Sequence, residues 1–477
     1  MGLILILVPL LLAGVAALWP WERHRPLFLP LANAVTLALS LVLAYNPSGA
    51  AWGDWLQLDA VGTVILLAVQ GLAFALSFYV VGYLRYRKER SNRVFTVSWL
   101  LFLGLASLVV LARHLGLMWV AIEGTTLATA PLIYFNRTRE SLEATWKYLL
   151  VLSVGIALAL LGTFFLAYAA FQAGLPPTLD YPTLVAEAHR LSPSWLNAAF
   201  LLLLVGYGTK IGLAPMHTWK PDAYGEAPGA AGALLAGGVT SLAFLAILRA
   251  YGIVAAAGLA NHFSALLTGV GLFSMAVAAL FLLGQKDLKR MLAYSSVEHM
   301  GILLLGLGTG GAALYGMMYH VFTNAGTKGV LFLTAGNIHR SYDSKKIDVV
   351  HGALRRLPLS GAVFLLGFFA ITGSPPFGPF FSEFSILTAI VQQGNLLLAI
   401  SFLALLFFVF LGMGKTVLHA LQGPIPPGTP QTPYREGVLT AGVPLLLLVV
   451  VLALGLFLPP GIQQWLQNAA SALGGHS

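Results

Sequence analysis

Apolar runs of about twenty residues follow one another along almost the whole chain, and they leave few folds open. A bilayer core is crossed by roughly 20 residues of helix, and inside lipid every backbone group must find a partner within the spanning structure. Only helices or a closed barrel meet that condition. The runs show no alternation of apolar and polar residues, and only 9% of the 477 residues are charged. The sequence therefore predicts an all-α membrane protein.

We expect about 14 transmembrane helices from these runs. They are predicted at residues 2–18, 27–45, 60–84, 94–112, 114–134, 142–170, 195–213, 229–251, 261–283, 291–308, 311–338, 361–392, 395–420 and 437–458. The predicted organisation is an N-terminal three-helix segment over 1–93, a first repeat over 94–251, a second repeat over 261–420, and a C-terminal helix and tail over 421–477.

Lys and Arg residues are distributed unevenly between the two sides of the predicted membrane. The loops after odd-numbered spans hold 19 of the 26, and the loops on the other side hold three, Arg113, Arg190 and Arg249. Because basic loops stay in the cytoplasm, we expect a multi-pass protein of a prokaryotic cytoplasmic (inner) membrane with both termini outside. The net charge of +9 follows this topology and does not indicate nucleic acid binding. The 19 residues are Arg23, Arg25, Arg85, Arg87, Lys88, Arg90, Arg93, Arg137, Arg139, Lys220, Lys286, Lys289, Arg290, Arg340, Lys345, Lys346, Arg355, Arg356 and Arg435.

The chain contains no cysteine. This excludes cysteine-ligated iron–sulfur clusters, disulfides and thiol chemistry. The histidines are too scattered for their spacing to indicate a metal site, and no set of Ser, His and Asp residues indicates hydrolysis. We therefore expect no cofactor, no metal and no catalytic residue in this chain.

Two predicted spans are interrupted by glycine and proline. Span 7 passes Gly206, Gly208 and Gly212 before Pro215, and span 12 contains the segment GSPPFGP at 373–379. Proline removes a backbone donor and clashes with the preceding turn, so both helices should break. The breaks lie five spans apart, so the two helices cross the membrane in opposite directions. This pattern predicts two inverted five-helix repeats, spans 4–8 and spans 9–13, although two simple proline kinks would also produce it.

Ionisable residues inside apolar spans need a partner, water or a function, because a charge at the bilayer centre costs about 2.5 to 10 kcal/mol or more. His320, Asn324 and Lys328 are spaced by four and should form one polar stripe along a helix. Acids, bases and imidazoles in such a row suit proton transfer. The candidate residues are Glu123, Lys147, Lys210, Glu298, His299, His320, Lys328 and Glu383, with His217 and Asp222 in the loop after the first break.

Several of these residues also have a purely structural interpretation. Lys147 lies near the start of its helix and can extend to the interface. Glu123 and Lys210 can form a structural ion pair. Glu383 can act as an anion near the start of the second half-helix.

Two further pairs of residues have structural alternatives as well. Glu298 and His299 can lie near the end of a span and anchor a basic loop. His217 and Asp222 can simply cap helices.

Four stretches resemble one known family. They are LKRMLAYSSVEHMGI, KIGLAPMHTWKPDAYGEAP, HVFTNAGTKGVLFLTAGN and PPFGPFFSEF. From about span 3 onward the chain resembles the antiporter-like, proton-translocating subunits of respiratory complex I, and most of all component F of hydrogenase-4 and formate hydrogenlyase type complexes.

The resemblance implies two inverted repeats, each containing a half-channel, joined by a central hydrophilic axis. It implies proton translocation by six matching residues. It leaves open whether Na⁺ is transported as well. It also implies partners: other membrane subunits, and redox subunits that carry iron–sulfur or metal centres. The matching residues are Glu123, Lys210, His299, His320, Lys328 and Glu383.

One departure concerns the link between the two halves. The complex I relatives usually carry a lysine or histidine in the middle of span 8, where this sequence has Ala236. Water beside Gly237, Gly238, Thr240 and Ser241 would be one substitute.

The same fold leaves other functions open. Two alternatives are a subunit of a multi-subunit Na⁺/H⁺ antiporter and a partner in a bicarbonate or CO₂ uptake system.

Overall fold

The computed structural model describes residues 1–87, 89–176, 178–425, 427–430 and 432–474. Lys88, one of the predicted loop cations, lies outside the described residues. Within these ranges the secondary structure is helical, with isolated β-bridges and no named strand. The fold class predicted from the sequence is confirmed. The α-helices are α1 (Gly2–Leu18), α2 (Phe28–Tyr45), α3 (Ala60–Tyr86), α4 (Arg93–Leu111), α5 (Leu115–Ile133), α6 (Arg139–Gln172), α7 (Tyr181–Ala186), α8 (Pro193–Ile211), α9 (Trp219–Glu226), α10 (Gly229–Leu234), α11 (Thr240–Ala256), α12 (Ala260–Leu283), α13 (Leu288–Thr309), α14 (Ala313–Tyr342), α15 (Ala353–Arg356), α16 (Pro358–Ile371), α17 (Gly378–Gln392), α18 (Leu396–Leu421), α19 (Val438–Leu456) and α20 (Pro460–Ala472).

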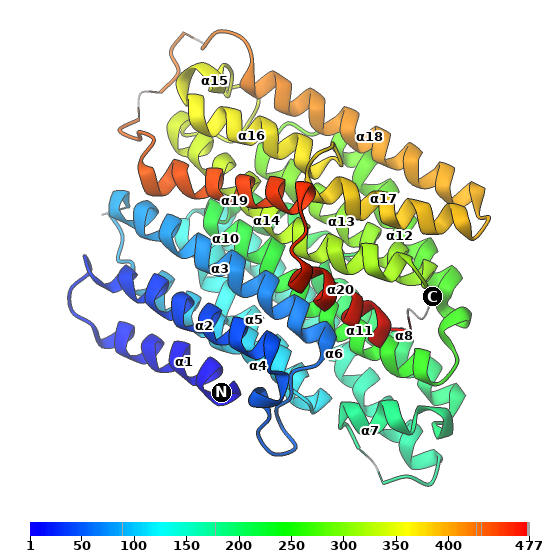
Figure 1. The fold of residues 1–477 in the computed structure, drawn as a ribbon. Helices are drawn as coiled ribbons and strands as arrows, with labels where there is room; N and C mark the ends of the chain where they lie inside the picture. The colour runs from blue at the N-terminus through cyan, green and yellow to red at the C-terminus, as the bar shows by residue number, and fades with distance from the viewer. Residues whose placement is uncertain (88, 177, 426, 431, 475–477) are drawn as a thin grey trace.

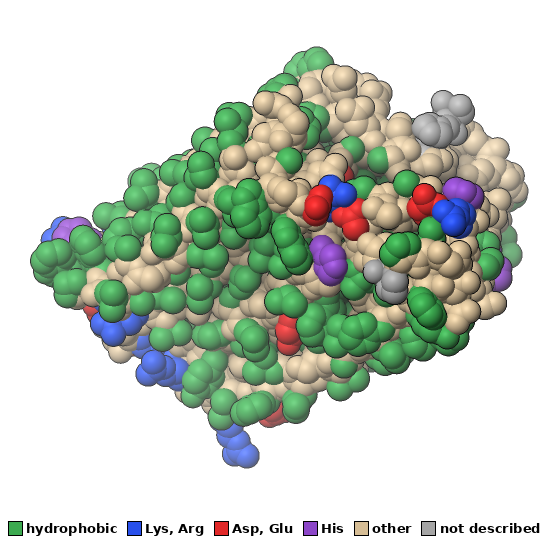
Figure 2. Space-filling view, turned by 90° about the horizontal axis from the view of Figure 1, so that it is seen from below, with side chains coloured by type: hydrophobic (Ala, Val, Ile, Leu, Met, Phe, Trp, Pro, Cys, Tyr) green, Lys and Arg blue, Asp and Glu red, His purple; other side chains and the backbone are tan. Residues whose placement is uncertain are grey.

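The long helices run roughly parallel across the molecule, with α1 and α2 at one edge and α18 at the opposite edge (Figure 1). Among the described residues, 11 helical segments are long and apolar enough to cross a membrane. The 30-residue α14 is not one of them, because its polar residues lower its mean hydropathy. Figure 2 shows hydrophobic side chains spread over much of one face, with few charged side chains among them, as expected of a surface part of which meets lipid.

Both predicted helix breaks are present. α8 ends at Ile211, and Gly212 follows with a φ of 73°, a value that suits glycine. α16 ends at Ile371, and the chain is unwound until α17 begins at Gly378. The peptides before Pro215 and Pro376 are cis.

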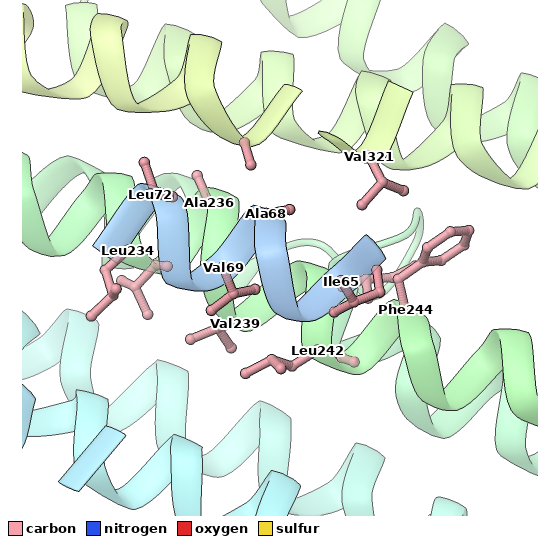
Figure 3. Packing of buried hydrophobic residues seen from close by; sticks show 14 of the residues in the cluster. Ile65, Ala68, Val69, Leu72, Leu234, Ala236, Val239, Leu242, Phe244 and Val321 are labelled. Atoms are coloured by element: carbon pink, nitrogen blue, oxygen red, sulfur yellow. The ribbon is translucent and has the colours of Figure 1, made fainter. Parts of the chain in front are cut away.

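Span 8, which we predicted over 229–251, is one continuous helical segment, Gly229–Ala256, with an irregular turn inside it. α10 and α11 are separated by a π-helical turn, Leu235–Val239, that contains Ala236. Figure 3 shows Ala236 packed near Leu72 of α3 among apolar side chains. A Cβ added at Gly237 would lie 2.4 Å from a methyl group of Leu72, so α3 packs closely against this turn. The hydroxyls of Thr240 and Ser241 bond to carbonyls of their own helix.

The loops gather on two faces of the molecule, as alternating spans require. On one face Arg113 bonds to Asp180, at the start of α7. On the other face, Lys345 lies 2.5 Å from Glu226. We name this face, which carries Arg87, Arg90, Lys289, Arg340, Lys345 and Lys346, the basic face. The tail that we predicted after the C-terminal helix contains a further helix, α20, which packs against α3.

Candidate functional site

Lys210 is buried at the end of α8, just before the first break. Its side chain is 2% exposed. Nζ donates to the backbone oxygen of Ile122 and to Oγ1 of Thr126, the latter at 2.5 Å. Both acceptors belong to α5. The ammonium group is therefore held by neutral oxygens of the neighbouring helix.

Glu123 lies beside this lysine but does not touch it directly. Oγ1 of Thr126 donates to a carboxylate oxygen of Glu123 at 3.2 Å, so the hydroxyl stands between Glu123 and Lys210. The two residues that we expected to pair lie close together, and Thr126, which no sequence pattern indicated, bridges them. The bridge can accept from the ammonium group while it donates to the carboxylate.

A row of polar side chains crosses from α13 through α14 to α17. Nδ1 of His299 lies 2.8 Å from Nε2 of His320, and the two rings are stacked with centroids 5.0 Å apart. Nδ1 of His320 lies 2.9 Å from Oγ of Ser382. All three side chains are fully buried. A neutral imidazole donates through one nitrogen and accepts through the other, so this row can pass a proton along its hydrogen bonds.

Carboxylates stand at both ends of this row. A carboxylate oxygen of Glu298 lies 3.5 Å from Nε2 of His299, and Glu383 directly follows Ser382 in α17. Oε2 of Glu298 and Oε1 of Glu383 are buried without a hydrogen-bond partner. Buried polar atoms almost always have a partner, so these two oxygens mark places where a proton or a water would bind.

The unwound segment makes room for Glu383. A Cβ added at Gly373 would lie 2.3 Å from Oε2 of this carboxylate. Glu383 lies in the second turn of α17, and no side chain caps that helix at Phe377. The capping interpretation of Glu383 therefore has no geometric support.

Lys328 lies two turns beyond His320 on α14 and also faces α13. Its Nζ lies 2.8 Å from Oγ of Ser295. Asn324, between the two, is buried, and its Oδ1 has no hydrogen-bond partner. The polar stripe that we predicted therefore faces the protein interior.

Lys220 is a buried cation that we had counted among the loop residues. Because α9 packs inside the protein, Lys220 is fully buried, and its Nζ lies 3.0 Å from Oγ of Ser296. Ser296 directly follows Ser295, the partner of Lys328. A Cβ added at Gly212 would lie 2.5 Å from the stem of Lys220, so the glycine that ends α8 also makes room for this lysine.

The remaining candidates lie elsewhere. Lys147 is half exposed and pairs with Glu143 at 2.7 Å and Asp222 at 2.9 Å, as its interfacial interpretation predicts. Asp222 also bonds to Arg290. The ring of His217 lies among aromatic rings, and its Nδ1 has no partner. None of these residues joins the row.

Three atoms that could bind a metal ion lie close together within the row. Nitrogens of His299 and His320 and an oxygen of Glu383 lie within 4.8 Å of one another. Their spacing in sequence gave no sign of this, because they come from three helices. One nitrogen of His299 and both nitrogens of His320 are used in hydrogen bonds, so a metal ion would have to displace the row.

The chain matches a family described as NADH:quinone oxidoreductase/Mrp antiporter, over residues 112–409. It is also 34% identical over 434 residues to a hydrogenase-4 component F homolog of Methylacidiphilum infernorum. That match covers 88% of this chain and 89% of that protein.

Two solved structures share the fold. A chain of the respiratory complex I of Thermus thermophilus matches with a TM-score of 0.78 and 28% identity, covering 96% of this chain and 97% of that one. A chain of an archaeal membrane-bound sulfane sulfur reductase matches with a TM-score of 0.88 over 99% of this chain and 97% of that one. At 21% identity, the second match shows the fold alone.

Proposed function

This chain belongs to the NADH:quinone oxidoreductase/Mrp antiporter family of membrane subunits, and we propose that it moves protons across the bilayer along its buried polar residues. Its relatives are antiporter-like subunits of multi-subunit membrane complexes. The observation that carries the proposal is the hydrogen-bonded row of His299, His320 and Ser382, which ends beside Glu383. Buried ionisable residues are costly in a membrane protein, so a row of them points to a function.

The order of contacts defines the proposed path. In the first half, Glu123, Thr126 and Lys210 form one connected group. In the second half, the group runs from Glu298 through the histidines to Glu383. Each group ends at a broken helix, where unwound backbone can line a hydrated space.

Lys220 supplies the proposed link between the two groups. It lies ten residues after Lys210, on the other side of the break, and it contacts Ser296. Ser295, the neighbour of Ser296, holds Lys328. The apolar packing around Ala236 makes this lysine a better link than water beside α10.

The chemistry of the row favours H⁺ over Na⁺. Hard cations prefer several oxygen ligands, and the centre of this row is built from imidazole nitrogens. The energy would come from partners, because a chain without cysteine holds no cysteine-ligated redox cluster. We propose partner subunits with iron–sulfur or metal centres.

The test uses the purified complex in sealed vesicles. His320→Gln keeps hydrogen bonding and removes the titration, and it should stop proton uptake while the redox activity of the partners continues. The matched control is His262→Gln, because His262 is exposed on α12. Normal proton uptake in the His320 variant would refute the proposed path.

We also propose a prokaryotic inner-membrane location with both termini outside. The chain has no cysteine, so single cysteines can be introduced at exposed Ser471, near the C-terminus, and at exposed Ser91 on the basic face. An impermeant thiol reagent applied to intact cells should label position 471 and not position 91. The reverse pattern would overturn the orientation.

A further inference from the structure

A cavity of about 800 Å³ opens on the basic face of the molecule. It lies between the ends of α3 and α14, the start of α13, and the loops near residues 136–140, 226–229 and 432–434. None of the residues of the proton path lines it. The cavity is therefore separate from the proposed function.

Cations outnumber acids in the lining of this cavity. The cations are Arg87, Arg90, Lys289, Arg340, Lys345 and Lys346, and the acids are Glu89, Glu140, Glu226 and Asp343. Two of the acids are already engaged, since Glu89 lies 2.5 Å from Arg87 and Glu226 lies 2.5 Å from Lys345. Among the described residues, Arg90, Lys289, Arg340 and Lys346 have no carboxylate partner within 4 Å.

Arg340 is the most informative of these cations. Its guanidinium carbon lies 4.8 Å from the ring centroid of Tyr434, 5.0 Å from that of Tyr83 and 5.3 Å from that of Tyr86. The rings fix the position of the guanidinium group. Its Nη1 is nevertheless buried without a hydrogen-bond partner. A fixed guanidinium that lacks an acceptor is prepared for an anion, and planar forked donors suit phosphate.

Lys289 adds a second cation in a buried position. Its side chain is 1% exposed, and its Nζ donates to the backbone oxygen of Ala227 at 3.0 Å. An ammonium group has three donors, so two remain for a ligand. The preference for basic residues on the cytoplasmic side explains how many cations this face has. It does not explain why a buried lysine and an unsatisfied arginine line the same cavity.

We propose that this cavity binds a phosphate-bearing anion, with Arg340 and Lys289 as its principal contacts. Basic pockets between membrane helices on the cytoplasmic side are typical sites for anionic lipid headgroups. The volume exceeds that of one phosphate, and the tyrosine rings offer apolar surface for the attached glycerol. The same chemistry would also accept free phosphate, and the experiment separates the two sources.

The test measures the thermal stability of the detergent-purified complex with three probes. These are diphosphatidylglycerol, inorganic phosphate, and phosphatidylcholine as the neutral control. A ligand that binds only the folded state raises the melting temperature, and at a fixed ligand concentration the increase is larger for a tighter ligand. We expect diphosphatidylglycerol to stabilise the complex and phosphatidylcholine to have no effect.

Arg340→Gln should weaken the binding of diphosphatidylglycerol about tenfold or more, because it removes charged hydrogen bonds. The matched control is Arg355→Gln, an exposed arginine of the same face that does not line the cavity. Lys346 lies at the exposed rim of the cavity, and Lys346→Gln should weaken binding less. This variant keeps the test valid if Arg340→Gln does not fold. Stabilisation by inorganic phosphate that Arg340→Gln removes would support free phosphate as the ligand. Equal responses of the wild type and Arg340→Gln to every probe would overturn the proposal.

Discussion

The two halves of the molecule hold their buried lysines in different ways. In the first half, Lys210 is bound by a carbonyl and a hydroxyl of one neighbouring helix. In the second half, Lys328 is bound by Ser295 of α13. One turn after Ser295, His299 of α13 stacks on His320 of α14. The first arrangement is compact, and the second extends over three helices.

This difference separates two tasks of a proton path. Neutral oxygens around a buried lysine offer it hydrogen bonds without a direct opposing charge, so its proton can leave at moderate cost. Imidazoles both donate and accept, so a row of them carries a proton over a distance. We therefore interpret the first half as a station that holds or releases a proton, and the second half as a relay that leads to Glu383.

The largest effect should follow from replacing Lys210, the residue that we interpret as holding or releasing a proton in the first half. Lys210→Ala leaves the carbonyl of Ile122 and the hydroxyl of Thr126 without their cation, and proton translocation should fall about hundredfold or more. Proton uptake by vesicles with the reconstituted complex measures this. Lys415→Ala, at an exposed position of α18, is the matched control and should pump normally. A Lys210 variant that assembles and pumps would show that the first half is only structural.

The second prediction concerns the end of the relay. Glu383→Gln keeps the size and removes the titration, so translocation should stop. Glu383→Asp keeps a shortened carboxylate and should retain part of the activity. A purely structural carboxylate would predict a loss of about 1 kcal/mol in stability with intact pumping. Measuring translocation and melting temperature for both variants distinguishes these outcomes.

The third prediction concerns the link between the halves. Lys220→Met keeps the length of the stem and removes the ammonium group that binds Ser296. Translocation should fall about tenfold, less than for Lys210→Ala, because water can partly replace a link. Lys220→Arg keeps the charge and should be less impaired if the link is electrostatic. Unchanged pumping in Lys220→Met would mean that the two halves work separately.

The sequence predicted the helices and their breaks well, because these depend on local chemistry. Apolar runs place the spans, and Pro215 and the segment 373–379 interrupt them wherever the chain folds. The burial of Lys210 and Lys328 also followed from their position in apolar runs.

Contacts between helices could not be predicted in the same way. The meeting of His299 with His320, and the place of Ser382 beyond them, depend on how three helices pack. Lys220 was missed because α9 has only eight residues, too few to show which side is buried. Its neighbours Trp219 and Tyr224 were the only sign in the sequence that this segment packs inside the protein.

The smallest predicted effect compares the short helices that join the third and fourth helices of each half. α7 is held by Asp180, which bonds to Arg113 and to the hydroxyl of Thr183 at 2.6 Å, whereas α15 is held by Arg356, which bonds to Ser341 and Pro430. Burial alone would raise the pKa of Asp180, but the bonds from Arg113 and Thr183 outweigh it and lower that pKa below its ordinary value. The unfolded pKa of aspartate is about 3.9, so the stabilising contribution of Asp180 is fully present above about pH 4.

This contribution is lost as the pH falls through the lowered pKa of the folded protein. The protection of α7 from hydrogen exchange, expressed relative to the intrinsic exchange rate at each pH, should therefore decrease at acid pH. The protection of α15 should change less, because neutral oxygens hold Arg356. Asp180→Asn should make α7 less stable at neutral pH by about 1 kcal/mol and remove this acid-dependent change. An equal acid response of α7 in the wild type and in Asp180→Asn would show that another group controls this loop.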